Sequence, residues 1–434
     1  MIINKCFSPI NSIKTVSQHS KSHSLMSWPC DCVSFSSKKI SFENTDFRGK
    51  FNDADYEIVK SISDFACKCN TNVYLVGGIV RDMLLGEKAN DIDFLVEGDA
   101  VEFTKELCKE HPEYKVDYLK DDFGTTKIRI NGQNIDIAST REESYIRKAI
   151  PVVSKIGCSM KKDVKRRDFT INSMALQLKT NESGEVQFIP VDIANGLDDL
   201  NSKTLRATYP KSFEDDPTRI IRGLKFRLRY GMKYDNKTQQ LIDQYLNNPP
   251  IDEISFSRVD TTLRKLFHNP NMAEKAFSAI IDEKIYKLFT PKINAKSHWG
   301  TRIKQACDIF GIEDMANVCM KLLDNKVTAP IIQSYDKNKK TSNYEIYKSF
   351  YRKSAESMAI YYIITQDQNA LKFNNELKQT KIFLQGADLI AMGIKPGKLI
   401  GEILDRILEA KLNGNSINSI DDEIKFVRNY LQSV

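Results

Sequence analysis

Two aspartates separated by one residue, Asp91 and Asp93, have the spacing of a metal-binding carboxylate pair. They begin the segment DIDFLV, whose apolar residues predict a strand. Because residues i and i+2 of a strand point to one face, we expect both carboxylates to converge while Ile92 faces the core. Such ligands, together with phosphate oxygens, suit Mg²⁺. Two metals would activate an attacking 3′-hydroxyl and stabilise a departing pyrophosphate, whereas an isolated pair of this kind also occurs at solvated strand ends.

Asp136 belongs to a later predicted strand, NIDIAS. Two interpretations are open for it. It is a third carboxylate on a strand beside the first two, or a strand residue with no metal role.

A glycine pair, Gly77 and Gly78, follows the predicted strand NVYLV and precedes a predicted helix that carries Arg81. Glycine allows a ligand to approach the backbone closely. A helix N-terminus presents free N–H groups to phosphate, and Arg81 adds a cation one turn into the helix. A plain strand-to-helix turn would use the same residues, but the aspartate pair that follows favours a nucleotide-phosphate site.

The segment KRRDFTINSMAL contains a second basic cluster, in which Arg166 and Arg167 are planar donors for phosphate oxygens. Asp168 and Asn172 are four residues apart, so they share a face if the segment is helical. Together they would hold a ribose hydroxyl. The alternative is a purely structural role for this segment, as a helix with a capped N-terminus that is preceded by basic residues.

The segment FEDDPTRIIR predicts a helix start, since Pro217 suits the first helical position and Asp216 the cap. Asp216 then either caps the helix only, or selects a base together with Arg219 on the same face. A carboxylate accepts from the exocyclic amine of C or A, and a guanidinium donates to the neighbouring ring acceptors, whereas G and U present the opposite pattern. Arg222 and Lys225 continue the basic stripe and would face phosphate or tRNA.

These residues lie in a chain whose first part alternates helices and strands and whose remainder is helical after about residue 210. In the first part, TKIRI and NIDIA are separated by NGQ, which predicts a hairpin. The other elements predicted there are helices over residues 55–69, 79–86 and 100–110, and strands over 72–76 and 91–96.

The composition is that of a globular protein, with 41% hydrophobic and 28% charged residues among 434. No apolar run approaches the roughly 20 residues that span a bilayer, so we expect no membrane association. The net charge of +7 permits a polyanionic partner. Nine cysteines without paired C-x-x-C spacing predict reduced thiols rather than a zinc site.

Residues 1–50 contain many Ser and Lys and a single acidic residue, Asp31, before Glu43. They are predicted to form an extension that is disordered or serves in targeting. Mitochondrial presequences are usually rich in arginine, and none occurs before Arg48. We therefore expect a cytoplasmic protein, with mitochondrial import through the extension as the alternative.

Four segments, YLVGGIVRDMLLGEKANDIDFLVEGDA, KRRDFTIN, DIANGLDDL and FEDDPTRIIR, occur in a characteristic order and spacing. Through them the chain resembles the class II tRNA nucleotidyltransferases (CCA-adding enzymes) and bacterial poly(A) polymerases from about residue 72 to 231. A weaker similarity, over residues 386–414, is to the C-terminal segment of the bacterial tRNA enzymes. The resemblance implies an α+β fold with a DNA polymerase β-like nucleotidyltransferase palm head (51–205), a helical neck (206–270) and a helical body and tail that binds tRNA (271–434).

The resemblance also implies roles for single residues. Asp91 and Asp93 match metal carboxylates, and Asp216 and Arg219 match an amino-acid template for C and A. The further contacts implied for the nucleotide are Gly78, Arg81, Arg167 and Arg222. The spacing arguments add Gly77, Asp168, Asn172 and Lys225 to the predicted nucleotide site.

Some positions depart from the family pattern. Asp215 stands where many relatives have Glu, and Lys225 stands where Arg is usual, which puts a bidentate contact there in doubt. TREESYIRKAIPVV keeps the T-R-x-E-x-Y pattern of a flexible loop linked to the switch from C to A addition, but lacks the usual Pro soon after the Tyr. The presence of this loop argues against an enzyme that adds C only.

The implied activity is addition of CCA from CTP and ATP to the 3′ end of tRNA, with Mg²⁺ as the cofactor. The alternatives are an enzyme that adds only A, a poly(A) polymerase, and a catalytically inactive RNA-binding protein. Poly(A) polymerases usually have a basic G-R-R-F-type stretch where this chain reads FGTTKIRI, and the intact aspartates argue against an inactive protein. The oligomeric state does not follow from the sequence.

Overall fold

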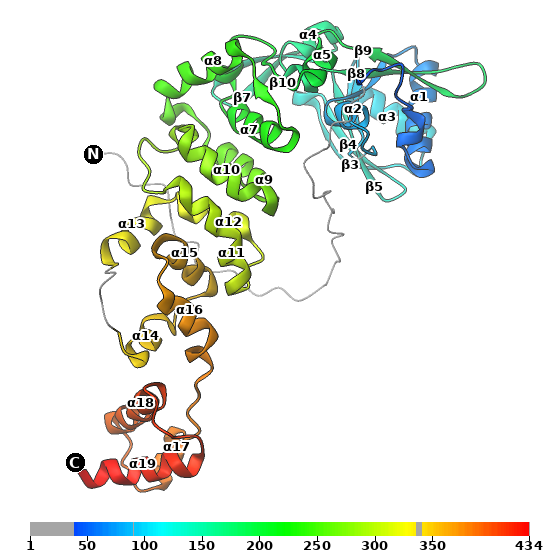
Figure 1. Cartoon of the computed structure of the whole chain (residues 1–434). Helices are drawn as coiled ribbons and strands as arrows, with labels where there is room; N and C mark the ends of the chain where they lie inside the picture. The colour runs from blue at the N-terminus through cyan, green and yellow to red at the C-terminus, as the bar shows by residue number, and fades with distance from the viewer. Residues whose placement is uncertain (1–38, 90, 336–340, 434) are drawn as a thin grey trace. The chain divides into compact units, whose positions relative to one another are not determined.

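A mixed sheet forms the centre of the first part of the chain (Figure 1). The structure is a computed structural model and describes residues 39–89, 91–335 and 341–433. The sheet has seven strands in the order β3-β4-β5-β2-β1-β8-β9, in which only β2 and β5 pair in parallel. The strands are β1 (Val73–Val76), β2 (Asp93–Val96), β3 (Lys115–Lys120), β4 (Thr125–Ile130), β5 (Gln133–Ser139), β8 (Ala175–Thr180) and β9 (Val186–Val191).

Two smaller sheets accompany it. β6 (Arg141–Arg147) and β7 (Ile150–Ile156) form an antiparallel hairpin, which is the form taken by the predicted flexible loop. β10 (Thr204–Leu205) pairs in parallel with β11 (Lys233–Tyr234). β11 therefore interrupts the region that was predicted to be entirely helical.

The first three helices of the head are α1 (Asp53–Lys68), α2 (Gly78–Leu84) and α3 (Ala100–Glu110). α1 begins after Asn52, whose side chain accepts from the N–H of Asp55, and α3 begins after Asp99 in the same way. α1 packs on β8 and β9, whereas α3 packs on β3, β4 and β5. The predicted helices, strands and NGQ hairpin of this part are confirmed to within about two residues.

Two local predictions about backbone conformation are wrong. β2 begins at Asp93, and Asp91 has φ of 51°, in the left-handed region, so strand alternation does not place its carboxylate. Around Asp168 the chain forms only a 3₁₀ turn, Thr170–Asn172, instead of an α-helix. The side chains of Asp168 and Asn172 still meet, because Asn172 Nδ2 donates to Asp168 Oδ1 over 3.0 Å.

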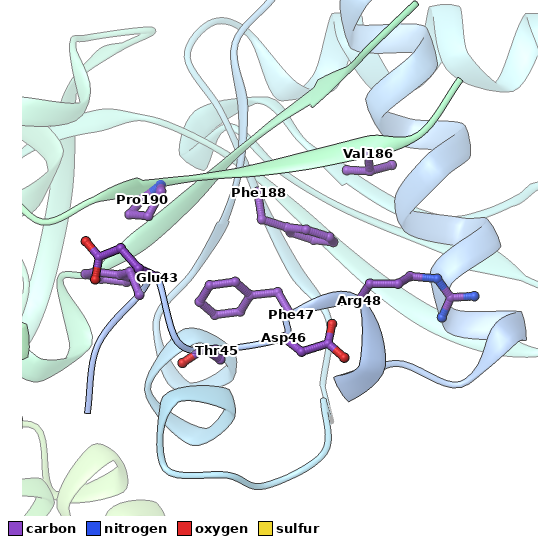
Figure 2. A pocket seen from close by; sticks show the side chains of 9 residues that line it. Glu43, Thr45, Asp46, Phe47, Arg48, Val186, Phe188 and Pro190 are labelled. Atoms are coloured by element: carbon purple, nitrogen blue, oxygen red, sulfur yellow. The ribbon is translucent and has the colours of Figure 1, made fainter. Parts of the chain in front are cut away.

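The segment before α1 packs against the head. Phe47 is 6% exposed and lies 6.0 Å from Phe188 of β9 between ring centroids, and Figure 2 shows the two rings facing each other in a shallow hollow. The side chain of Asn201 accepts from the N–H of Ile40 (2.8 Å) and donates to its carbonyl (2.9 Å). Residues from Ile40 onward therefore belong to the head, although the sequence placed its start at residue 51. The prediction for residues 1–38 lies outside the described residues.

The remainder of the described chain is built mainly from helices. Two short helices lie within the head itself, α4 (Met160–Val164) before β8 and α5 (Gly196–Asn201) after β9. The helices after the head are α6 (Ser212–Asp215), α7 (Thr218–Tyr230), α8 (Asn236–Asn247), α9 (Phe256–Phe267), α10 (Pro270–Asp282), α11 (Gly300–Phe310), α12 (Met315–Leu323), α13 (Asn325–Ser334), α14 (Asn343–Phe350), α15 (Ala355–Thr365), α16 (Gln368–Asn375), α17 (Gly386–Ala391), α18 (Lys398–Leu412) and α19 (Ile420–Ser433). α17, α18 and α19 share a small apolar core of their own. Within the described residues no helix has the length and apolar character needed to cross a membrane. This architecture confirms the predicted α+β fold with a helical remainder.

Candidate active site

Three carboxylates approach one another at the start of β2. Asp93 opens the strand and is the register partner of Asp136 on β5. Solvent reaches the Asp93 side chain, but partial desolvation and the nearby carboxylates of Asp136 and Asp91 raise the pKa of Asp93 to about 6. Asp136 already has a counter-ion, because Lys127 Nζ lies 3.1 Å from its Oδ2. The remaining negative charge belongs to Asp91 and Asp93.

Asp91 and Asp93 fit a divalent cation such as Mg²⁺. Both are oxygen donors that solvent reaches, and they are close enough for Asp91 to raise the pKa of Asp93. In the part of the chain that the structure describes, no three His, Cys, Asp or Glu side chains converge as a metal site. Asp136 thus does not complete a three-carboxylate site in this arrangement, and water and phosphate oxygens would supply the other ligands.

The glycine turn lies between β1 and α2. Gly77 has φ of 77°, a conformation that strains any residue with a Cβ. A Cβ on Gly77 would lie 3.9 Å from Nη1 of Arg167, which brings the turn and the second basic cluster together. From the sequence, only the family-like order of the two motifs indicated that Gly77 and Arg167 lie close together.

Arg81 is buried, with 4% of its surface exposed. It pairs with Asp82 at 2.8 Å, donates through Nη1 to Asn172 Oδ1, and lies 4.9 Å from the ring centroid of Tyr230. These contacts give Arg81 a positioning role between α2, the 3₁₀ turn and α7. Its contact with phosphate stays a prediction.

Asp163 organises the second basic cluster, although it was not among the residues predicted for the site. Its carboxylate is fully buried and accepts from Arg166 (2.6 Å), Arg167 (2.9 Å) and the N–H of Arg141 (3.1 Å). Burial opposes this charge, but the two guanidinium groups hold the pKa of Asp163 below its usual range. Arg166 and Arg167 are thereby fixed in orientation. An Asp three and four residues before a pair of arginines is the only sequence signal for this clamp.

Asp168 is the centre of a second buried cluster. One oxygen accepts from Asn172 and the other from Arg222, at 2.8 Å from Nε and 2.7 Å from Nη2. Burial opposes the charge, yet Arg222 and the amide of Asn172 lower the pKa of Asp168 to about 2. The cluster joins the head to α7, and its outer member, Arg222, remains exposed.

Asp216 and Arg219 lie at the start of α7, 7% and 5% exposed. Asp216 Oδ1 accepts from the N–H of Thr218 at 3.0 Å, so the predicted capping contact is present, although the helix itself begins one residue later than predicted. Asp216 Oδ2 lies 3.3 Å from Nη2 of Arg258. Arg219 donates to the backbone oxygen of Arg166 at 2.7 Å. The two residues therefore share a site without pairing to each other.

Lys225, one turn beyond Arg222 on α7, has an unusual titration. Burial, and then the cations Arg229, Arg222 and Arg81, lower the pKa of Lys225 to about 8. A phosphate bound nearby would favour the protonated form, so binding would take up a proton. We expect the affinity for CTP to fall by up to about tenfold from pH 7 to pH 9 in the wild type. In Lys225→Arg, which stays charged, the affinity should change much less. Calorimetry at several pH values measures the CTP affinity of both proteins. If the affinity changes equally with pH in the wild type and in Lys225→Arg, Lys225 does not contact the phosphates.

Comparison with known proteins agrees with this geometry. Residues 73–206 match the protein family described as the poly A polymerase head domain. The A-adding tRNA nucleotidyltransferase of Aquifex aeolicus is 40% identical over 175 residues, which cover 40% of this chain but only 20% of that protein. The A-adding tRNA nucleotidyltransferase of Halalkalibacterium halodurans is 27% identical over 86% of this chain and 92% of that protein.

A solved structure extends the similarity to the helical part. The apo form II of a CCA-adding enzyme superposes with a TM-score of 0.72 at 26% identity, over 89% of this chain and 98% of that one. The match therefore includes the helices after the head as well as the sheet. Together with the carboxylate pair, the glycine turn and the start of α7, these comparisons show that the chain is similar to tRNA nucleotidyltransferases and that its residues 73–206 resemble a poly A polymerase head domain.

Proposed function

We propose that this protein adds nucleotides from CTP and ATP to the 3′ end of tRNA without a nucleic-acid template. One observation carries the proposal: the base-selecting candidate Arg219 donates to the backbone oxygen of Arg166, and the guanidinium of the adjacent Arg167 lies beside the glycine turn, 3.9 Å from where a Cβ on Gly77 would be. A nucleotide whose base lies at Arg219 and whose phosphates lie at that turn would have its reacting phosphate near Asp93. The names of the relatives support tRNA as the acceptor.

Each part of the site has a physical role in this proposal. Mg²⁺ held by Asp91 and Asp93 would supply charge stabilisation for the triphosphate and the attacking 3′-hydroxyl. Arg167, fixed by Asp163, is oriented to donate to phosphate oxygens. Asp216 accepts from the amine of C or A, and Arg219 donates to a ring acceptor.

The number of nucleotides added distinguishes two candidates. Full CCA addition is supported by the neighbour in structure, which is a CCA-adding enzyme, and by other relatives in sequence that are CCA-adding enzymes. Addition of A alone is supported by two relatives in sequence, which are A-adding enzymes. Incubation of the protein with tRNA lacking CCA, tRNA ending in C and tRNA ending in CC, with each NTP separately, separates them. An A-adding enzyme extends only the third substrate, and failure with all three would exclude the proposed function.

Asp216→Asn tests base selection while preserving the helix cap. The asparagine oxygen still accepts from the N–H of Thr218, but its amide now donates where a carboxylate accepted. We expect exclusion of UTP and GTP to weaken by about 1–3 kcal/mol per lost contact, which is roughly 5- to 150-fold in kcat/KM ratios. Arg219→Ala should also weaken the exclusion of UTP and GTP, because the donor to the ring acceptor is lost. The loss of discrimination in the double variant should be smaller than the sum of the two single losses. An unchanged ranking of the four NTPs would leave Asp216 as a cap only.

A further inference from the structure

The two terminal nitrogens of Arg219 already donate to protein acceptors. Nη1 donates to the hydroxyls of Tyr209 (3.0 Å) and Ser212 (2.8 Å). Nη2 donates to the hydroxyl of Tyr145 (3.1 Å) and to the backbone oxygen of Arg166 (2.7 Å). Two terminal nitrogens carry four hydrogens, so these four acceptors use them all, and the backbone oxygen of Ser212 lies farther from Nη1, at 3.4 Å. A base that accepts from a terminal nitrogen must displace one of them.

The four acceptors differ in how firmly they are held. The Arg166 acceptor is a backbone oxygen, and Ser212 is completely buried. Tyr209 lies in the segment that leads into α6 and donates its hydroxyl hydrogen to Asp215 over 2.7 Å. Tyr145 alone comes from the β6–β7 hairpin, a sheet separate from both the head sheet and α7. Its hydroxyl is therefore the acceptor that can leave without disturbing the start of α7.

We propose that the Tyr145 hydroxyl holds the place of the base on Arg219 and that CTP or ATP binds by displacing it. This inference rests on the proposed function, because it takes Arg219 as the residue that reads the base. It makes Tyr145 a positioning residue that acts on the nucleotide through Arg219. When no nucleotide is bound, the Tyr145 hydroxyl accepts from the buried Arg219 guanidinium, which would otherwise have one N–H without a partner.

The hydroxyl is suited to such an exchange. It donates its hydrogen to Glu143 Oε2 at 3.0 Å, which leaves its lone pair for Arg219. Glu143 is held in turn by Arg141 (2.8 Å) and Arg166 (3.2 Å). Burial raises the pKa of Tyr145, so the group stays a neutral hydroxyl at physiological pH. When the base binds, the neutral Tyr145 hydroxyl is replaced by a neutral ring nitrogen of the base, so Arg219 keeps the same number of hydrogen bonds.

The exchange is selective by its chemistry. C and A present a ring nitrogen that accepts, next to their amine, so either can replace the hydroxyl oxygen. G and U present a ring N–H at this position, which would face the N–H of Arg219. Displacing Tyr145 for G or U therefore leaves a buried donor unpaired, which adds to the discrimination made by Asp216.

Tyr145→Phe tests the exchange, with Tyr209→Phe as the matched control. Both variants keep a ring beside Arg219, where the guanidinium lies 6.0 Å from the centroid of Tyr145 and 5.5 Å from that of Tyr209. In Tyr145→Phe the nucleotide no longer competes with a hydroxyl, so the Kd for CTP and ATP should fall by about 3- to 10-fold. Tyr209→Phe removes a fixed partner and should raise these Kd values. The Kd for GTP should not improve in either variant.

Equilibrium titration with Mg²⁺ and no tRNA gives these constants, and a thermal melt of each variant accompanies it. A merely structural role predicts weaker binding and a lower melting temperature in both variants. If Tyr145→Phe binds CTP and ATP no more tightly than the wild type, the inference is overturned. Tyr145→Leu, which also lacks the hydroxyl, provides the same readout if the phenylalanine variant is poorly folded. Addition of nucleotides to tRNA by the wild type tests the proposed function separately, so the two failures are distinguishable.

Discussion

Replacing Asp93 or Asp91 by alanine should lower the rate of nucleotide addition to tRNA by at least about 10³-fold. Asp93 lies beside Asp136 and close to Asp91, and partial burial together with these two carboxylates raises the pKa of Asp93 to about 6. Alanine removes one of the two carboxylates available to the metal. Single-turnover extension of labelled tRNA with saturating CTP or ATP measures the loss.

Two controls make this result specific. Binding of tRNA should stay near the wild-type level, since the helical body and tail, residues 271–434, are predicted to hold the tRNA. Asp122→Ala removes an exposed carboxylate of the same head and should retain activity. In the wild type, metal binding should weaken as the pH falls below about 6, because a proton then competes for Asp93. Near-normal turnover by either alanine variant at position 91 or 93 would contradict the metal assignment.

Asp163→Ala should destabilise the protein by about 3–5 kcal/mol, the usual cost of removing one partner of a buried ion pair. The carboxylate is completely buried between Arg166 and Arg167, so its loss leaves two guanidinium groups without their counter-charge. Urea unfolding measures the change in the free energy of unfolding. Because the pKa of Asp163 is lowered in the folded state, its contribution should disappear as the pH falls below about 4.

Asp163→Asn is the matched variant. It keeps the shape and one acceptor oxygen but not the charge, so its stability should lie between those of Asp163→Ala and the wild type. Both variants should also bind CTP more weakly, because Arg167 loses the bond that orients it. A loss of less than about 1 kcal/mol in Asp163→Ala would mean that water replaces the carboxylate at the two arginines.

Hydrophobic periodicity and turn residues predicted the helices and strands of the head well, because the conformation of each element depends mainly on residues close together in the sequence. Asn131 and Gly132 both have positive φ, as the predicted two-residue turn of the hairpin requires, and the alternation in its strands matches their burial. Asp91 shows where such reasoning stops. A single residue in the left-handed conformation leaves no periodic pattern in the sequence. The alternation rule therefore placed Asp91 in the strand, although the strand begins two residues later, at Asp93.

The partners of the candidate site were harder to predict for another reason. Tyr145 and Arg219 are 74 residues apart, and Arg222 and Asp168 are 54 apart. Helix and strand periods relate only residues close in sequence, so contacts of this kind depend on the tertiary fold. The motifs identified Arg219, Asp168 and Arg222 as site residues, but not the hydrogen bonds that orient them.

The two hydrogen bonds between Asn201 and the backbone of Ile40 bear on how the N-terminal extension could be processed. A protease that cut just after Ile40 would remove the residue that Asn201 binds, and one that cut after Phe47 would also remove Phe42 and Phe47 from the β9 edge and expose Phe188 to solvent. Apolar surface beside an edge strand promotes association between molecules. A maturation cut compatible with a stable head therefore has to fall before Ile40, and N-terminal sequencing of the protein from its host would locate it.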